Sequence, residues 1–463
     1  MSEEMKTLRK QLLRDSRSGY DVLEEAQLRR MEDYCADYKA FLGNKTERLS
    51  ARAAIAAAEA HGFVEYRRGM ALEAGDKVYT CNRGKGLMLA VMGRESMAEG
   101  VQIAAAHIDS PRLDLKPNPL YEDSELAYFK THYYGGIRKY QWVTIPLQLQ
   151  GVVVKKDGTA VEVCIGEKGE PQLVITDLLP HLGGEQGKKP LSEAIPAETL
   201  NILLGSRPIG DEDDSDRVKF HVMKRLYDKY GITEADFASA ELEAVPAADA
   251  VDIGIDGSMI GSYGHDDRVC GYAALRALLE LDAPAKTAVC VLADKEEIGS
   301  MGVTGMQSAV FETFLSDLCD SQNVPLKVCF ENSFCLSADV TAAYDPNFAD
   351  VFDKKNAAFL NHGVGLCKYT GARGKSGSSD AGAETVAYVR SLLDGAGVRW
   401  QICELGKVDA GGGGTVAQYM ANRNIATLDA GVPVLSMHAP FEVVAKLDCY
   451  EMYRACKAIY EAR

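Results

Sequence analysis

Four short segments combine histidine and carboxylate side chains in spacings that suit metal chemistry. The first places His107 at the end of an apolar run, with Asp109 two residues later. An imidazole at a strand end is a natural metal ligand, and a carboxylate two residues on points the same way and can accept the second ring N–H. A hydrogen-bonded surface pair is the more common explanation of a single His-x-Asp match.

The second and third segments supply further carboxylates. Asp266 stands just before an expected helix, where a helix cap is the simpler explanation and a bridge between two metal ions is the functional one. Glu296 and Glu297 belong to the segment 294–300, which directly follows the apolar run 287–293. Two adjacent carboxylates at a strand end point to different sides, so one can bind metal while the other acts as a general base. Their place after a buried strand disfavours an ordinary acidic loop.

The fourth set consists of Asp339 and His438, each of which follows or ends an apolar run. Taken singly, either residue fits an ordinary loop equally well. Together with the other segments they place two histidines and several carboxylates at the rim of one predicted sheet. Nitrogen and oxygen ligands of this kind indicate a dinuclear site for zinc, with cobalt or manganese as alternatives.

The elements that must position these residues alternate between strand and helix. Residues 20–60 have helical periodicity, and the runs 86–93 and 101–106 are expected to be buried strands. Further along, we expect helices over 266–281, 380–393 and 442–463 and strands over 287–293 and 400–403. This pattern predicts an α/β fold with a mixed, largely parallel sheet flanked by helices, whose ligands gather at the carboxyl ends of the strands.

The composition changes between about 119 and 252. Here we expect strands over 142–154, 161–164 and 172–175, a loop over 183–215 and a helix over 216–230. The chain has 463 residues, which exceeds what one core usually fills. We therefore expect a catalytic domain of residues 1–118 and 253–463, interrupted by an inserted β-rich domain of residues 119–252.

Charge, hydropathy and cysteine usage exclude several classes of function. A net charge of −16 disfavours binding of nucleic acid, which needs clustered Lys and Arg. No stretch of 18 apolar residues appears, so no membrane span is expected, and the acidic N-terminal sequence has no signal-peptide core. The 12 cysteines are scattered without a CxxC pair, which is typical of reduced thiols in a cytoplasmic protein.

The joint pattern resembles a known family. The segments AHIDSPRLDLKP, GHDDRVCGYAAL, DKEEIGS, SADV and VLSMHAPFE are similar to those of the aspartyl aminopeptidase family of zinc metallopeptidases. The resemblance implies peptide substrates with a free N-terminus, a zinc-peptidase fold and two zinc ions per subunit. The ligands that it implies are His107 and Asp339 on one ion, Glu297 and His438 on the other, and Asp266 between them. It also implies Glu296 as the general base and Asp109 as the hydrogen-bonding partner of His107.

The resemblance extends to assembly. In the family, a histidine of the inserted domain reaches the active site of a neighbouring subunit. The segment 175–182 looks like that element, which makes His181 the candidate. The resemblance also implies a homo-oligomer of twelve subunits built from dimers.

Some features depart from the family and leave alternatives open. Residues 340–347 lack the histidines that family members often carry before Pro-Asn, so the side chain preferred at the cleaved N-terminal position (P1) is expected to be acidic or neutral. Lys368, Arg373 and Lys375 are candidate partners for an acidic P1 residue or simply solvated loop residues. Other possible functions are a carboxypeptidase, an N-acyl deacylase, or a non-catalytic assembly protein that keeps the fold. A phosphate-binding loop at 374–376 is disfavoured, because Tyr369 stands where that motif needs glycine.

Overall fold

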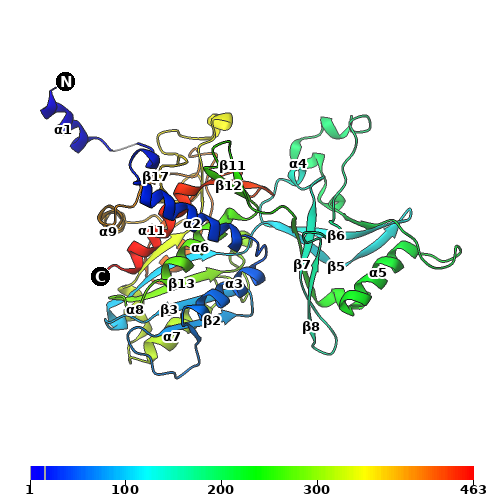
Figure 1. Ribbon diagram of the computed structural model, residues 1–463, viewed down its shortest axis with the longest axis horizontal. Helices are drawn as coiled ribbons and strands as arrows, with labels where there is room; N and C mark the ends of the chain where they lie inside the picture. Colours follow the sequence, from blue (N-terminus) through cyan, green and yellow to red (C-terminus); the bar gives the residue numbers. More distant parts are fainter. Residues whose placement is uncertain (1, 15–16) are drawn as a thin grey trace.

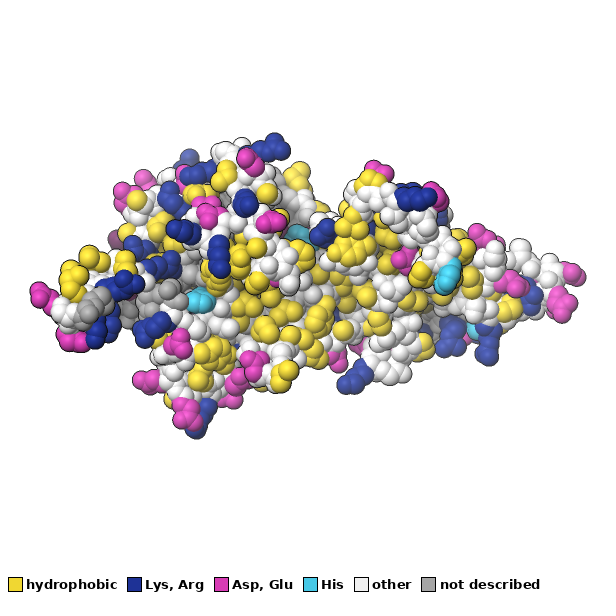
Figure 2. Space-filling view, turned by 90° about the horizontal axis from the view of Figure 1, so that it is seen from above, with side chains coloured by type: hydrophobic (Ala, Val, Ile, Leu, Met, Phe, Trp, Pro, Cys, Tyr) yellow, Lys and Arg dark blue, Asp and Glu magenta, His cyan; other side chains and the backbone are white. Residues whose placement is uncertain are grey.

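The computed structural model describes residues 2–14 and 17–463 of the chain. These residues form two lobes that lie side by side along the long axis of the molecule (Figure 1). The large lobe contains a nine-stranded sheet, and the small lobe contains a six-stranded antiparallel sheet that extends away from it. A notch separates the two lobes in the space-filling view, and acidic and basic side chains are spread over both (Figure 2).

The nine-stranded sheet is built around parallel strands whose carboxyl ends meet at one edge. Strand β4 (Val101–His107) pairs in parallel with β13 (Thr287–Ala293) and β14 (Phe334–Ala338), and β18 (Ala426–Gly431) continues beyond β14. Every residue of β4 and β13 is buried, as expected for strands covered on both faces. The outer strands are β3 (Gly86–Val91), β2 (Lys77–Asn82) and β1 (Val64–Glu65) beside β13, and β16 (Val364–Cys367) and β17 (Trp400–Ile402) beside β18.

The sheet is mixed, because β3 and β16 run antiparallel to their inner neighbours. Helices cover both of its faces, and side chains of β4 alternate between the two resulting cores, with Ala104 and Ala106 in one and Ile103 and Ala105 in the other. The expected α/β fold is therefore confirmed. The helices on the first face are α2 (Glu25–Phe41), α3 (Glu47–Ala60), α6 (His265–Leu279), α9 (Ala383–Gly395) and α11 (Lys446–Tyr460), and those on the second are α7 (Val310–Asp320), α8 (Leu326–Glu331) and α10 (Ala417–Ala421). Helix α1 (Glu3–Leu12) has no buried residue.

A third, five-stranded sheet carries loops of the large lobe. Its strands, in spatial order, are β11 (Val251–Ile253), β12 (Met259–Ser262), β20 (Glu442–Ala445), β19 (Pro433–Leu435) and β15 (Thr341–Ala342). The helix expected over 442–463 is wrong at its start. Residues 442–445 form β20, which pairs antiparallel with both β12 and β19, and helix α11 begins only after it.

The small lobe holds the six-stranded sheet around a core of its own. Its strands, in spatial order, are β8 (Ala160–Ile165), β7 (Leu147–Val154), β10 (Ala240–Pro246), β5 (Arg112–Asp123), β6 (Leu126–Tyr134) and β9 (Ile202–Gly205). Helix α5 (Arg217–Tyr230) packs on this sheet, and α4 (Leu191–Ala194) contacts the short helices η3 (Lys139–Gln141) and η4 (Gln186–Lys188).

Three sequence expectations for the small lobe need correction. The strand expected from 142 begins only at Leu147, directly after Pro146, which has no N–H to donate to a ladder. Residues 172–175 form isolated bridges at Leu173 and Val174 instead of a strand. The stretch expected as loop, 183–215, contains the short helix α4 and the strand β9.

The helices and the cysteines of the described residues show two further features. Among the helices of the described residues, none combines the length and the apolar character that crossing a bilayer requires. All 12 cysteines lie within the described ranges, and each is a free thiol.

Candidate metal centre

His107 ends strand β4 at the carboxyl edge of the large sheet and is buried. Its Nε2 atom lies 3.1 Å from Asp266 Oδ1 and 3.9 Å from both Glu296 Oε2 and Asp339 Oδ1. The other ring nitrogen, Nδ1, lies 2.9 Å from the carbonyl oxygen of Asp109 and 3.3 Å from its carboxylate. The carbonyl is therefore the nearer acceptor, although the sequence suggested the carboxylate.

Asp266 lies between two histidines. Its Oδ1 atom is 3.1 Å from Nε2 of His107, and its Oδ2 atom is 3.1 Å from Nε2 of His438. Gly264 is the N-cap residue of α6, and Asp266, two residues later, has non-helical dihedral angles. The peptide bond between Asp266 and Asp267 is cis. The carboxylate thus does not cap the helix and faces both histidines, which is the arrangement that a shared ligand requires.

His438 lies in the turn between β19 and β20. Its Nε2 atom is 3.6 Å from Glu297 Oε2, and its Nδ1 atom is 2.8 Å from the carbonyl oxygen of Gly136. The Oε1 atom of Glu297 is buried and has no hydrogen-bond partner among residues 2–14 and 17–463. A buried carboxylate oxygen without a partner is unfavourable unless a cation or water meets it.

The donor atoms form two groups that share Asp266. One group is His107, Asp266 and Asp339, and the other is Asp266, Glu297 and His438, and within each group the ligand atoms lie within 4.8 Å of one another. Imidazole nitrogens and carboxylate oxygens are ligands that zinc accepts. The residues present therefore fit two zinc ions with a common carboxylate, and the unpartnered oxygen of Glu297 points to the same conclusion.

Crowding of buried charges perturbs the protonation of these groups. Burial, together with the neighbouring carboxylates Asp109 and Asp266, raises the pKa of Glu296 to about 7. Burial opposes protonation of His438, but its contacts with Asp266 and Glu297 outweigh that effect and raise its pKa to about 10. Burial alone would raise the pKa of Asp266, yet the two histidine rings hold it below its ordinary value. Perturbed groups clustered at a strand edge are typical of a functional site.

Asp109 organises the turn that carries the two glutamates. Its carboxylate accepts hydrogen bonds from the backbone N–H groups of Glu296 at 3.1 Å and Glu297 at 3.3 Å. It also accepts a hydrogen bond of 2.8 Å from the hydroxyl of Tyr134. Asp109 therefore holds the short helix η7 (Glu296–Ile298) in place, in addition to lying beside the ring of His107.

Two further buried carboxylates support the centre and were not identified from the sequence. Glu442 accepts hydrogen bonds from the backbone N–H groups of His438 at 2.7 Å and Asp266 at 3.1 Å, and burial with the nearby Asp266 raises its pKa to about 8. Asp267 accepts a hydrogen bond of 3.3 Å from the backbone N–H of His107. A signal was present for Glu442, since it follows His438 by four residues within the same segment of the resemblance.

His181 is not part of this centre in the single chain. It is exposed in the small lobe, within a segment where Leu178, Leu179 and Leu182 are 53%, 50% and 68% exposed. The cationic residues considered for an acidic P1 side chain also have partners or open surroundings. Lys368 and Lys375 each lie 3.0 Å from a carboxylate oxygen of Asp380.

Arg373 lies near the second of these lysines. It lines a cavity of about 140 Å³ together with Lys375, Tyr369 and Glu404. The ammonium group of Lys375 stacks on the ring of Tyr369 at 3.9 Å.

A comparison with known families decides the identity. The sequence profile described as aminopeptidase I zinc metalloprotease (M18) matches residues 44–460. The chain belongs to the M18 aminopeptidase family. The resemblance that the motifs indicated is thereby confirmed, and the chain is an M18 zinc aminopeptidase, a hydrolase of peptide bonds.

Individual M18 proteins match along nearly their whole length. The probable M18 family aminopeptidase 1 of Clostridium acetobutylicum is 48% identical over 450 residues, which cover 95% of this chain and 97% of that protein. The crystal structure of an M18 aminopeptidase from Thermotoga maritima superposes with a TM-score of 0.93 at 42% identity, over 97% of this chain and 100% of that one. Aminopeptidase I from C. acetobutylicum superposes with a TM-score of 0.92 at 44% identity, with the same coverage. M18 membership favours the aminopeptidase over the carboxypeptidase, the deacylase and the non-catalytic protein.

Proposed function

We propose that this M18 aminopeptidase binds two zinc ions, with cobalt or manganese as substitutes that the same ligands accept. His107 and Asp339 hold one ion, Glu297 and His438 hold the other, and Asp266 is shared. The observation that carries this proposal is the position of Asp266, whose two carboxylate oxygens each lie 3.1 Å from the Nε2 atom of a different histidine.

Glu296 is proposed as the general base. When bound, zinc supplies Lewis acidity toward a carbonyl oxygen and toward water. Glu296 belongs to neither ligand group, and its pKa of about 7 suits a carboxylate that accepts a proton from water and then passes it to the leaving amine. The backbone hydrogen bond to Asp109 fixes the start of the turn on which this base stands.

The proposed substrates are peptides with a free N-terminus, and the P1 preference includes neutral residues as well as acidic ones. An acidic P1 side chain needs a cation to meet it in the binding site. Lys368 and Lys375 both pair with Asp380, whose single carboxylate compensates part of their combined charge. This pairing supports a preference that is broader than acidic residues alone.

We further propose that the chain acts as a cytoplasmic homo-oligomer, a dodecamer built from dimers. Exposed leucines around His181 provide an apolar segment that a neighbouring subunit can cover. In that assembly His181 contributes to the active site of the neighbour, where its ring can stabilise the developing oxyanion. Free thiols at all 12 cysteines agree with a reducing compartment.

Metal content in ligand variants tests the ligand assignment. We expect His438→Ala to retain one zinc ion per chain and Asp266→Ala to retain fewer, because Asp266 serves both ions. His61→Ala is the matched control, since His61 is exposed at the end of α3 and should leave two zinc ions bound. Two zinc ions per chain in His438→Ala would contradict the assignment.

A further inference from the structure

The chain segment that ends strand β6 touches the metal centre through three consecutive residues, Tyr134, Gly135 and Gly136, which we call the β6 anchor. Tyr134 is the last residue of β6 in the six-stranded sheet of the small lobe, and Gly135 and Gly136 follow it directly, whereas the contacts of the anchor are with three separate segments of the large lobe. Those segments carry Asp109, two residues after the end of β4, and the proposed ligands Glu297 and His438. The small lobe is therefore in direct contact with the groups proposed to hold zinc.

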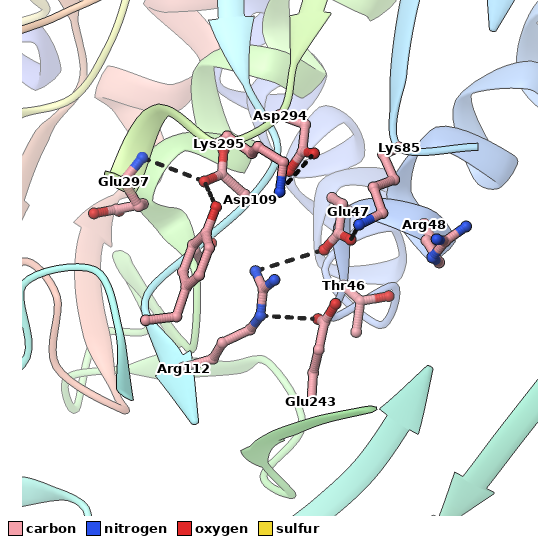
Figure 3. A network of polar contacts seen from close by, with 12 residues as sticks. Thr46, Glu47, Arg48, Lys85, Asp109, Arg112, Glu243, Asp294, Lys295 and Glu297 are labelled. Atoms are coloured by element: carbon pink, nitrogen blue, oxygen red, sulfur yellow. Dashed lines mark hydrogen bonds and ion pairs between the residues drawn. The ribbon is translucent and has the colours of Figure 1, made fainter. Parts of the chain in front are cut away.

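Tyr134 contacts the first of these segments. Its hydroxyl donates a hydrogen bond of 2.8 Å to Asp109, which in turn accepts from the backbone of Glu296 and Glu297. The ring is buried, and the guanidinium of Arg112 stacks over it at 3.9 Å. Figure 3 shows Arg112 pointing toward Glu47 and Glu243, so the cation that supports the ring is itself held in place.

Gly136 contacts the third segment. Its carbonyl oxygen accepts a hydrogen bond of 2.8 Å from Nδ1 of His438. A histidine whose Nδ1 atom donates in this way presents the lone pair of Nε2, which here faces Asp266 and Glu297. Carbonyl contacts of this kind fix the tautomer and the ring orientation of metal-binding histidines.

Gly135 allows the close approach between these two contacts. It has a φ of 75°, and a Cβ atom at this position would lie 3.2 Å from Oε2 and 3.3 Å from Cβ of Glu297. Glycine adopts this backbone conformation without the penalty that side chains incur. Any larger residue would strain the backbone and press on Glu297.

We propose that the β6 anchor positions the zinc ligands, so that the small lobe is part of the metal site and not only a surface for assembly. The proposal rests on the ligand roles given above. Tyr134 and Gly136 act as positioning residues, Tyr134 through Asp109 and Gly136 through His438. Partners of this type typically change metal affinity or activity by about 10- to 100-fold when they are removed.

The variant Tyr134→Phe tests the first contact, because it removes only the hydroxyl and keeps the ring over Arg112. We expect the zinc dissociation constant, measured by competition with a chromophoric chelator, to rise by about 10- to 100-fold. We expect kcat on an aminoacyl-nitroanilide to fall while KM changes little. Tyr133→Phe is the matched control, because Tyr133 is the preceding residue, is 42% exposed and should show none of these changes.

The variant Gly135→Ala tests the close approach to Glu297. Its matched control is Gly158→Ala in the turn between β7 and β8. Gly158 has a φ of 86° and nothing within 4 Å of the added Cβ, so it carries similar backbone strain without a contact at the metal centre. We expect Gly135→Ala to weaken zinc binding by about tenfold or more and Gly158→Ala to leave it unchanged.

Three results would overturn the proposal. The first is wild-type zinc affinity and kcat in Tyr134→Phe. The second is equal zinc affinity in Gly135→Ala and Gly158→Ala. The third is a loss of zinc binding in an anchor variant whose zinc-free form is also destabilised toward unfolding by enough to account for that loss. The ligand variant His438→Ala distinguishes a failure of the β6 anchor from a failure of the ligand assignment. If it loses zinc while the anchor variants do not, only the β6 anchor fails, and if it keeps two zinc ions, the ligand assignment fails and the anchor falls with it.

Discussion

Replacement of Arg112 by methionine should strongly destabilise the junction between the lobes. Arg112 stands at the start of β5 and is 6% exposed. Its guanidinium lies 3.6 Å from Glu47 of α3 and 3.3 Å from Glu243 of β10 (Figure 3). It also lies 2.8 Å from Asp114. Glu47 and Glu243 are 1% and 3% exposed, so Arg112 lies between two buried carboxylates from different lobes, and Lys85 is a second cation 4.0 Å from Glu47.

The distances set the size of the effect. When the carboxylate is ionised, two unit charges 3.3 to 3.6 Å apart interact by about 5 kcal/mol at an effective dielectric constant of about 20. Desolvation of the ions offsets part of this, and removal of one partner from a buried pair typically costs about 3–5 kcal/mol, because the other charge remains buried. We therefore expect Arg112→Met to lower the free energy of unfolding by about 3–5 kcal/mol at pH 8.

The loss of unfolding free energy in Arg112→Met should become smaller as the pH falls. Burial raises the pKa of Glu243, and Arg112 opposes that rise, so the pKa of Glu243 climbs further in the variant. A carboxyl group whose pKa is higher in the folded state than in the unfolded state favours folding at low pH and loses that contribution as the pH rises. The difference between variant and wild type should thus be smaller at pH 5 than at pH 8.

Urea denaturation of the zinc-free proteins measures this effect without interference from the metal. Arg52→Met is the matched control, because Arg52 pairs with Glu162 across the same junction while both side chains are more than half exposed. Exposed pairs contribute about 0–1 kcal/mol. A loss below about 1 kcal/mol in Arg112→Met, or a loss that does not depend on pH, would refute the reasoning.

Three further predictions follow from the site and its surroundings. A mixture of His181→Ala subunits with Glu296→Gln subunits should regain activity that neither variant shows alone, and no regain would show that His181 does not act across an interface. Asp380→Asn should free Lys368 and Lys375 from their ion pairs. The ratio of kcat/KM for a glutamyl nitroanilide to kcat/KM for a leucyl nitroanilide should then rise by about fivefold, the equivalent of about 1 kcal/mol. An unchanged ratio would place these lysines outside the P1 site. Zinc affinity should fall from pH 8 to pH 6, since bound zinc must displace protons from ligands such as the imidazole of His438, whose pKa is raised to about 10, and a pH-independent dissociation constant would contradict this.

The central strands could be predicted because burial on both faces leaves an unmistakable pattern. The runs at 101–106 and 287–293 are apolar except for Gln102 and Thr287, and both are strands of the parallel core. The paired strands β5 and β6 escaped prediction as individual elements, since their exposed and buried residues are mixed along the sequence. The start of α11 was misplaced because β20 runs directly into it, and only its pairing with β12 and β19 distinguishes the two.

The residues of the site also fall into those that the sequence could predict and those that it could not. Residues such as His107 and Glu297 could be proposed because each lies at or within a few residues of the end of an apolar run that becomes a central strand. Tyr134 and Gly136 could not be proposed from the sequence, because their roles depend on how the small lobe docks on the large one. No local sequence pattern encodes that contact. The nearer acceptor for Nδ1 of His107 was also out of reach, since the backbone carbonyl of Asp109 leaves no mark in the sequence.

The variant Glu296→Gln tests the central claim most directly, because it removes the proposed base and leaves every proposed ligand in place. Zinc per chain and kcat should be measured on the same preparation. The account predicts two zinc ions per chain together with a fall in kcat of roughly 10²- to 10⁴-fold. Near-native turnover, or loss of zinc from the variant, would contradict it.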